Sequence, residues 1–240
     1  MKQNKISILS TRPLQAELIN MAAEKNIEIE TISFIETKAI EDDSLEQRIL
    51  HLSHHQLTIV FTSMNAVEVV SSYLSNKKID WKIFCLDSTT KKLVKENFGE
   101  NSIAGTADSA SNLADVIVNQ KNISSIIFFC GDKRRDELPD KLAKHNIEVN
   151  EIEVYKTLET PHLITRNYDA ILFYSPSAVS SFFSINKINE QTILFAIGST
   201  TANEIKKYSD NKIIVGKKPE KELLTGEVIN YFTTSTIHHS

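Results

Sequence analysis

Four short turns of this sequence place serine and threonine hydroxyls directly after apolar runs and directly before helical patterns. They are Thr62-Ser63, Ser88-Thr89-Thr90, Ser175-Pro176-Ser177 and Ser199-Thr200-Thr201. The amides that open a helix carry partial positive charge and neighbouring hydroxyls add donors, so such turns suit carboxylates. Simple N-capping is the alternative for each turn. Because the same turn chemistry recurs in both halves of the chain, we favour binding, with two facing domains aiming these turns at one cleft.

Basic residues also lie directly after apolar runs. Arg12 follows the first apolar run, and the basic cluster 133–135, which begins with Lys133, follows the apolar run 125–129. One or two of these cations can face an acidic ligand, which needs only local positive charge. Salt bridges on a helix surface, to the acidic pair 136–137, are the alternative interpretation of the cluster.

The sequence indicates no metal and no cofactor. His51, His54 and His55 have a spacing that can place imidazoles on one helix face. No Cys, Asp or Glu pattern completes a ligand set, so we expect these histidines to end a solvated helix. G-x-G-x-x-G after the first strand, G-x-x-x-x-G-K-[ST] and G-x-S-x-G are all missing, and 6 glycines leave little material for phosphate-binding loops.

Composition narrows the class of protein. With 240 residues, 41% hydrophobic and 24% charged, the chain is long enough for two globular domains. A net charge of −4 argues against a nucleic-acid partner, which requires a basic face. Cys85 and Cys130 lie beside apolar residues, which indicates buried thiols in a reducing cytosol. The first apolar stretch is too short for a signal core or a membrane helix, so we expect a cytoplasmic protein.

Ten short apolar or β-branched runs alternate with helical patterns and predict strands. They are residues 6–9, 28–32, 57–61, 82–86, 102–104, 125–129, 149–154, 170–173, 193–197 and 212–215. Strands alternating with helices imply parallel sheets covered by helices on both faces, which is an α/β fold. The hydroxyl turns then lie at the carboxyl ends of strands, where open parallel sheets bind ligands.

An internal repeat organises these elements. IVFTSMNAVEVV (59–70) matches ILFYSPSAVSSF (171–182), and KNIEIETISFIETK (25–38) matches HNIEVNEIEVYKT (145–157). The order along the chain is A, B, A′, B′, with A at residues 6–38 and B at 57–119. Each unit is too small to form a domain alone. Two pairings can complete the sheets: A with B and A′ with B′, or A with B′ and B with A′.

The second pairing inserts one domain into another and is the one we favour. The polar segments 37–43 and 157–166 lack periodicity and would then be linkers lying side by side. Tyr155 would lie where the chain passes between the domains. A packing role with a satisfied hydroxyl is the alternative for this tyrosine.

Five segments together resemble the uroporphyrinogen-III synthase family. They are FTSMNAVE (61–68), CGDKRRDELP (130–139), VYKT (154–157), FYSPSAV (173–179) and AIGSTTA (196–202). The resemblance covers nearly the whole chain. It implies two similar flavodoxin-like or Rossmann-like domains with parallel sheets, one inserted into the other and joined by a two-stranded linker. The expected domains are residues 1–36 plus 160–240, and residues 39–157, with the active site in the cleft between them and no cofactor or metal.

The resemblance also implies site residues. Tyr155 and Thr201, the expected catalytic residues, match family positions, as do Thr62, Ser63, Ser175 and Thr200 as substrate-binding residues. The hydroxyl turns and the charge pattern add Arg12, Lys133, Ser177 and Ser199 to the expected substrate-binding residues. The chain departs from the family at Met64-Asn65, where many members have Pro-Arg, and at Asp87, where glycine is usual. These departures weaken the expectation of carboxylate contacts at the two turns concerned.

The implied activity is that of a lyase, which closes hydroxymethylbilane into a macrocycle with loss of water and inversion of ring D. Loss of the terminal hydroxyl leaves an electron-deficient azafulvene, and the enzyme must direct attack at the already substituted carbon through a spiro intermediate. Tyr155 is the expected donor to the leaving hydroxyl. A monomer with this small polycarboxylate as its partner is expected. An anionic-solute-binding protein with two domains and a cleft is the alternative, and a glycosyl transferase is the enzymatic one.

Overall fold

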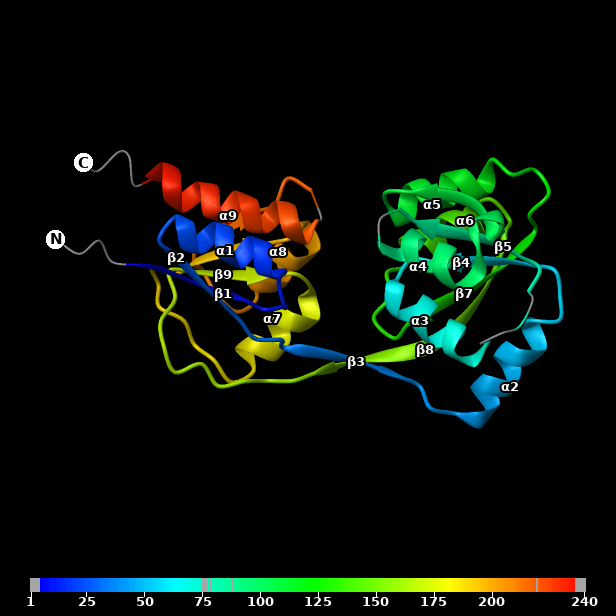
Figure 1. The fold of residues 1–240 in the computed structure, drawn as a ribbon, viewed down its shortest axis with the longest axis horizontal. Helices are drawn as coiled ribbons and strands as arrows, with labels where there is room; N and C mark the ends of the chain where they lie inside the picture. The colour runs from blue at the N-terminus through cyan, green and yellow to red at the C-terminus, as the bar shows by residue number, and fades with distance from the viewer. Residues whose placement is uncertain (1–4, 75–76, 78, 88, 219, 236–240) are drawn as a thin grey trace. The chain divides into compact units, whose positions relative to one another are not determined.

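The computed structural model describes residues 5–74, 77, 79–87, 89–218 and 220–235. The chain divides into two compact units (Figure 1). Unit 1 comprises the described residues up to Glu36 together with those from Leu158 onward, and unit 2 is Thr37–Thr157. Each unit is a parallel-dominated sheet with helices on both faces, which confirms the α/β fold class. No helix in the described ranges combines the length and apolarity needed to cross a bilayer.

Unit 1 is built on a five-stranded sheet in the order β11-β10-β9-β1-β2, with parallel pairing throughout. Its strands are β1 (Ile6–Ser10), β2 (Ile27–Thr31), β9 (Ala170–Phe173), β10 (Ile193–Ala196) and β11 (Ile213–Val215). Its helices are α1 (Ala16–Glu24), α7 (Pro176–Phe183), α8 (Ser199–Ile205) and α9 (Lys221–Ser235). Buried side chains of α7 and α8 pack on one face of the sheet, and those of α1 and α9 on the other.

Unit 2 holds a six-stranded sheet in the order β3-β8-β7-β4-β5-β6. Its strands are β3 (Ile35–Ala39), β4 (Leu57–Phe61), β5 (Trp81–Leu86), β6 (Ile103–Ala107), β7 (Ser125–Gly131) and β8 (Glu148–Glu159). Its helices are α2 (Asp43–Leu52), α3 (Met64–Tyr73), α4 (Thr89–Phe98), a 3₁₀ turn at Glu100–Ser102, α5 (Ala110–Val118) and α6 (Glu137–Lys144). Helices α2, α3 and α4 cover one face, and α5 and α6 cover the other.

The strand order realises the inserted pairing of the repeat. Strands β1 and β2 of segment A pair with β9, β10 and β11 of segment B′, whereas β4, β5 and β6 of segment B pair with β7 and β8 of segment A′. Both sheets therefore share one order of repeat-equivalent strands, β11-β10-β9-β1-β2 in unit 1 and β6-β5-β4-β7-β8 in unit 2. Numbered along the chain, the strands of unit 2 have the 3-2-1-4-5 order of a Rossmann-like sheet, whereas those of unit 1 have the 2-1-3-4-5 order of a flavodoxin-like sheet. Neither A nor B has enough strands alone, so each completes its sheet with the complementary repeat.

Strands β3 and β8 form the two-stranded linker that the family resemblance implied, although no local pattern marked β3 as a strand. Ile40 N donates to Val154 O at 2.9 Å, and Thr160 N donates to Phe34 O at 3.0 Å, so the strands run antiparallel. The boundary between the units falls within both strands. Segments 37–43 and 157–166 were expected to be irregular, and their first residues are instead part of these strands. Main-chain hydrogen bonds alone can hold a ladder whose side chains are largely exposed, and such a ladder leaves no hydrophobic alternation.

Each sheet has a switch point, where the strand order reverses and the two flanking strands send their helices to opposite faces. In unit 1, β9 leads to α7 on one face, whereas β1 leads to α1 on the other. In unit 2, β4 leads to α3 and β7 leads to α6 in the same divergent way. The loops leaving such a pair diverge and open a crevice outside the carboxyl ends of the strands, where ligands bind in this class of fold.

Replacement of a buried ring tests the packing of unit 1. Phe182 is 1% exposed and meets Phe34 and Phe173 edge to face at 5.1 and 5.4 Å. Phe182→Ala should lower the free energy of unfolding by about 3–5 kcal/mol, because it leaves a cavity. Urea titration followed by circular dichroism measures this change. Leu163→Ala is the control: this leucine is 70% exposed, and its loss should cost less than about 0.5 kcal/mol. Similar losses in both variants would contradict the packing described.

Candidate functional site

The carboxyl ends of β4 and β7 hold the polar turns of unit 2. Thr62 and Ser63 follow β4, and Ser63 caps α3 by accepting a hydrogen bond from Asn65 N at 3.2 Å. Gly131 ends the neighbouring strand β7 and begins the turn to α6, where Arg134 N donates to Gly131 O at 3.1 Å. The capping role anticipated for Ser63 is therefore present, and it leaves the serine hydroxyl at the crevice between the diverging helices.

Tyr155 joins this edge from β8, the next strand of the sheet. Its hydroxyl donates to Ser63 Oγ at 3.1 Å. Asp132, in the turn after β7, binds the backbone of β8 at Tyr155 and Thr157. Asp132 N donates to Tyr155 O at 3.2 Å, and Asp132 Oδ1 accepts from Thr157 N at 2.8 Å. The structure thus brings Tyr155 and Ser63 together although they are far apart in the sequence.

The environment of Tyr155 keeps its phenol protonated at neutral pH. Burial raises the pKa of Tyr155 above its ordinary value, and the nearby Cys130 and Asp132 add to the rise. Hydrogen bonds with Ser63 and Asn65 oppose it, because they stabilise the phenolate. A protonated phenol with two groups ready to stabilise its conjugate base is suited to donate a proton.

Two residues of the basic cluster 133–135 differ in their surroundings: Arg134 is paired with carboxylates, and Lys133 is exposed. Arg134 forms ion pairs with Asp136 and Glu151, so the salt-bridge interpretation holds for this arginine. Lys133 is exposed, and no ion pair joins it to another of the described residues. Lys133 is therefore a cation available at the carboxyl edge of unit 2.

In unit 1, three predicted positions lie at the ends of adjacent strands. Arg12 follows β1, Ser175 follows β9, and Ser199 opens the helix after β10, in the sheet order β10-β9-β1. Ser175 caps α7 by accepting from Ala178 N at 3.2 Å. Arg12, Ser175 and Ser177 are half-buried, whereas Ser199 and Thr200 are exposed. These groups share one edge of unit 1, in the arrangement seen in unit 2.

Thr201, expected to be a catalytic residue, lies in the core of unit 1. Its side chain is 1% exposed, and its Oγ1 finds no hydrogen-bond partner among the described residues. Together with Ala202 and Ile205 it forms the face of α8 that packs into the core of unit 1. A buried hydroxyl on the core face cannot contact a ligand at the surface of this unit, so Thr201 is not retained as a proton donor.

A buried hydroxyl network beneath the Arg12 turn went unnoticed in the sequence. Ser10 Oγ donates to Arg12 O at 2.6 Å and lies 3.2 Å from the hydroxyl of Tyr174. That hydroxyl also lies 3.4 Å from Thr225 Oγ1, on α9. Burial raises the pKa of Tyr174, so the network consists of neutral hydroxyls. The available signal was a serine, Ser10, directly after the apolar pair Ile8-Leu9 at the end of β1.

No metal centre forms in the part of the chain that the structure describes. No group of three His, Cys, Asp or Glu side chains there could hold a metal ion. The rings of His51 and His55 lie 4.9 Å apart, and α2 ends before His54. Ser88, which begins the hydroxyl turn at residues 88–90, falls outside the described residues. Burial raises the pKa of Cys85 to about 11 and of Cys130 to about 12, as befits inert buried thiols.

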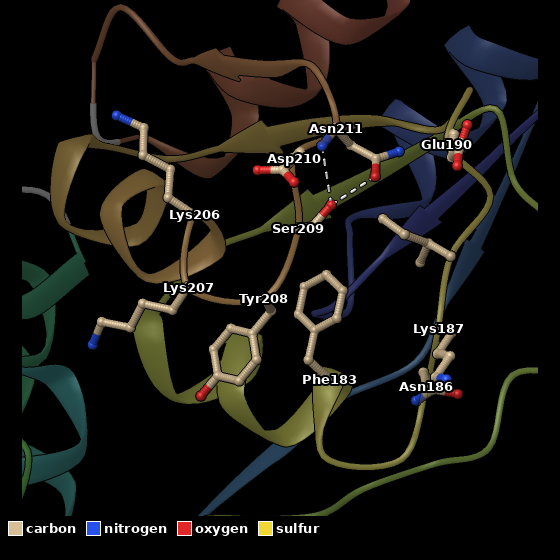
Figure 2. A pocket seen from close by; sticks show the side chains of 11 residues that line it. Phe183, Asn186, Lys187, Glu190, Lys206, Lys207, Tyr208, Ser209, Asp210 and Asn211 are labelled. Carbon is tan, nitrogen blue, oxygen red and sulfur yellow. Dashed lines mark hydrogen bonds between the residues drawn. The ribbon is translucent and has the colours of Figure 1, made fainter.

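A cavity of about 780 Å³ lies at the opposite, amino edge of the unit 1 sheet (Figure 2). The stacked rings of Phe183 and Tyr208 form part of its wall, with centroids 5.3 Å apart. Two of its polar side chains form hydrogen bonds within the loops: Asn211 Nδ2 donates to the backbone oxygens of residues 189 and 192, and Ser209 Oγ donates to Asn211 Oδ1. These groups stabilise the connections that lead into β10 and β11, and we do not assign a substrate to this cavity.

Comparisons with known proteins agree with this architecture. The family model described as uroporphyrinogen-III synthase HemD matches residues 16–226. Uroporphyrinogen-III synthetase from Helicobacter pylori superposes with a TM-score of 0.63 at 17% identity, covering 94% of this chain and 99% of that one. A mutant uroporphyrinogen III synthase from the extremely thermophilic bacterium Thermus thermophilus gives a TM-score of 0.62 at 14% identity, covering 96% and 99%.

No protein with a curated description matches the chain in sequence. The two solved structures share the fold at low identity, whereas the family model spans most of the chain. The chain therefore belongs to the uroporphyrinogen-III synthase family.

Proposed function

We propose that this chain closes hydroxymethylbilane to uroporphyrinogen III as a lyase that needs no cofactor. The observation that carries the proposal is the protonated Tyr155 phenol, hydrogen-bonded to Ser63 at the carboxyl edge of the unit 2 sheet. A neutral donor at that position suits a reaction that begins with loss of a hydroxyl group as water.

The proposed first step is a proton transfer from Tyr155 to the terminal hydroxyl of the substrate. The carbon–oxygen bond then breaks, water leaves, and an azafulvene-type carbon remains. Ser63 and Asn65 stabilise the phenolate, in keeping with their lowering effect on the pKa of Tyr155. Attack by the substituted carbon of the last pyrrole gives the spiro intermediate. The original bond from that carbon to its methylene bridge then breaks, which leaves a new azafulvene-type carbon on ring C, and the free α-carbon of ring D attacks this carbon, so that the macrocycle closes with ring D inverted. The proton that the macrocycle finally loses returns to the phenolate, so the enzyme is regenerated.

Substrate binding is proposed to rest on the polar turns of both units. Hydroxymethylbilane carries acetate and propionate groups, which hydroxyls, amides and isolated cations can hold. In unit 2 the proposed contacts are Thr62, Ser63 and Lys133. In unit 1 they are Arg12, Ser175, Ser177, Ser199 and Thr200. The support for this assignment is that each set lies at the carboxyl edge of its parallel sheet.

The proposal includes a monomer that acts in the cytoplasm without nucleic acid. A two-domain protein that binds an anionic solute without turnover is the competing function. It would use the same hydroxyl turns, but a buried tyrosine donor would have no task in it. The assay below separates the two.

Conversion of hydroxymethylbilane tests the proposal directly. The purified chain, without added metal or nucleotide, should form mainly uroporphyrinogen III, because no step needs redox change or phosphate chemistry. After oxidation, chromatography separates isomer III from isomer I. Uncatalysed closure supplies the control, since it gives isomer I. Isomer I at the background rate would favour the solute-binding alternative, and loss of isomer III on prolonged treatment with a chelator would contradict cofactor independence.

Removal of one hydroxyl tests the proton donor. Tyr155→Phe should lower kcat at least tenfold with little change in KM, because it deletes general-acid assistance while the ring keeps its packing. The ratio of wild-type to variant kcat should persist from about pH 7 to about pH 9, since burial raises the pKa of the phenol and the donor form is lost only above that pKa. Unchanged kcat in the variant would remove Tyr155 from the mechanism.

Salt dependence tests the exposed cation at the unit 2 edge. Raising ionic strength from about 0.01 M to about 0.15 M shortens the screening length from about 30 Å to about 8 Å, so KM should rise several-fold with kcat unchanged. Lys133→Gln should raise KM at low salt and weaken this dependence. Lys144→Gln is the matched control, because Lys144 ends α6 and lies away from the carboxyl edge. Equal behaviour of the two variants would assign binding to backbone amides and hydroxyls instead.

A further inference from the structure

We propose that Gly131 is a positioning residue for Tyr155: the space left by its missing side chain receives the tyrosine ring and holds the hydroxyl at Ser63. The inference rests on the proposed function for its effect on turnover. The packing of the Tyr155 ring on Gly131 does not depend on that function.

A bulge in β8 turns Tyr155 toward the α3 face of the sheet. Cys130 pairs with Glu153, whereas the next residue of β7, Gly131, pairs with Tyr155, so β8 contains one extra residue at this point. Ile152 and Val154 are buried in the cluster beneath α3, and Tyr155 packs against the same cluster. Strict alternation would send Tyr155 to the opposite face. The bulge instead directs it to the face where α3 begins, in the way that bulges re-aim side chains beside active sites.

The ring occupies the position that a side chain at residue 131 would fill. A Cβ atom on Gly131 would overlap with Cε2 and Cζ of Tyr155 and lie 2.9 Å from its hydroxyl oxygen. Phe129, two residues earlier on the same strand, points into the cluster beneath α3, so the absent side chain of Gly131 would point there too. The two strands therefore fit together only because residue 131 has no Cβ.

Backbone conformation gives no separate reason for glycine at this position. Among the glycines of the described residues, a positive φ occurs at Gly99 and not at Gly131. Glycine inside a strand loses packing and costs conformational entropy, so its presence at a buried strand end calls for a close approach by another group. The Tyr155 ring is that group.

Rigid placement of the ring matters because a proton donor acts only over hydrogen-bond distance. The ring rests on Gly131, the hydroxyl is held by Ser63, and the strand is held by Asp132 on both sides of Tyr155. A displacement of the hydroxyl by about 1 Å can cost on the order of a hundredfold in rate. Gly131 thus acts on the reaction through Tyr155 and touches no substrate itself.

The test compares Gly131→Ala with Gly226→Ala. A Cβ at Gly226, in α9, would meet nothing within 4 Å, so this control adds the same methyl group without a clash. Gly131→Ala should lower kcat at least tenfold with little change in KM, and Gly226→Ala should leave both unchanged. In the Tyr155→Phe background the rate loss from Gly131→Ala should disappear, because the hydroxyl that it misplaces is already absent. A full additional loss in that background would overturn the positioning role.

A second measurement does not depend on activity. Gly131→Ala should lower the urea midpoint, and combining it with Tyr155→Ala should recover much of that loss, because the added methyl group then fills space vacated by the ring. Additive losses would overturn the proposed packing. If Tyr155→Phe keeps full activity while this non-additivity is found, the proposed proton donor fails and the packing inference stands. This cycle also remains measurable if Gly131→Ala folds only marginally.

Discussion

Parallel strand direction is the constraint on which every part of the site depends. When all neighbouring strands of a sheet point the same way, the segments that follow them emerge at one edge. In unit 1 this places residues after β1, β9 and β10 together, and in unit 2 residues after β4 and β7. No local sequence signal has to bring these groups together. The antiparallel strand β3 is the exception in its sheet, and it joins outside β8, where it leaves the parallel core undisturbed.

The chemistry at these edges relies on hydroxyls more than on fixed charge. The chain carries 31 acidic and 27 basic side chains, so a general positive field cannot attract a polycarboxylate. Arg134 is neutralised locally by Asp136 and Glu151, which leaves few cations free at the unit 2 edge. Hydroxyls and helix amides can hold carboxylates without that field, and they also leave the phenol of Tyr155 protonated. A strongly basic site would stabilise the phenolate and weaken Tyr155 as a proton donor.

The features that could be predicted are those that produce a regular pattern of residue types along the sequence. Apolar runs located all ten strands of the two parallel sheets, and N-capping, the alternative interpretation of the repeated turn after β4 and β9, is present at Ser63 and Ser175. No local pattern marked β3 as a strand, because exposed side chains in a strand show no alternation, and only the family resemblance implied the two-stranded linker. The burial of Thr201 depends on the rotation of a short helix, which a Ser-Thr-Thr run does not specify. The position of Tyr155 depends on one extra residue in β8 and on a side chain missing from β7, and both are visible only in the pairing of two strands.

The pairing of β1 with β9 also sets an order of events on the ribosome. Ile8 pairs with Ala170, so β1 is synthesised about 160 residues before one of its two neighbours in the sheet exists. At translation rates of about 5–20 residues per second, that interval lasts roughly 8–32 s. All the strands that complete unit 2 emerge within it, so unit 2 can fold while β1, α1 and β2 remain without their sheet. The nascent chain therefore displays an apolar strand with a free edge throughout that interval, which is the kind of exposed surface that chaperones shield.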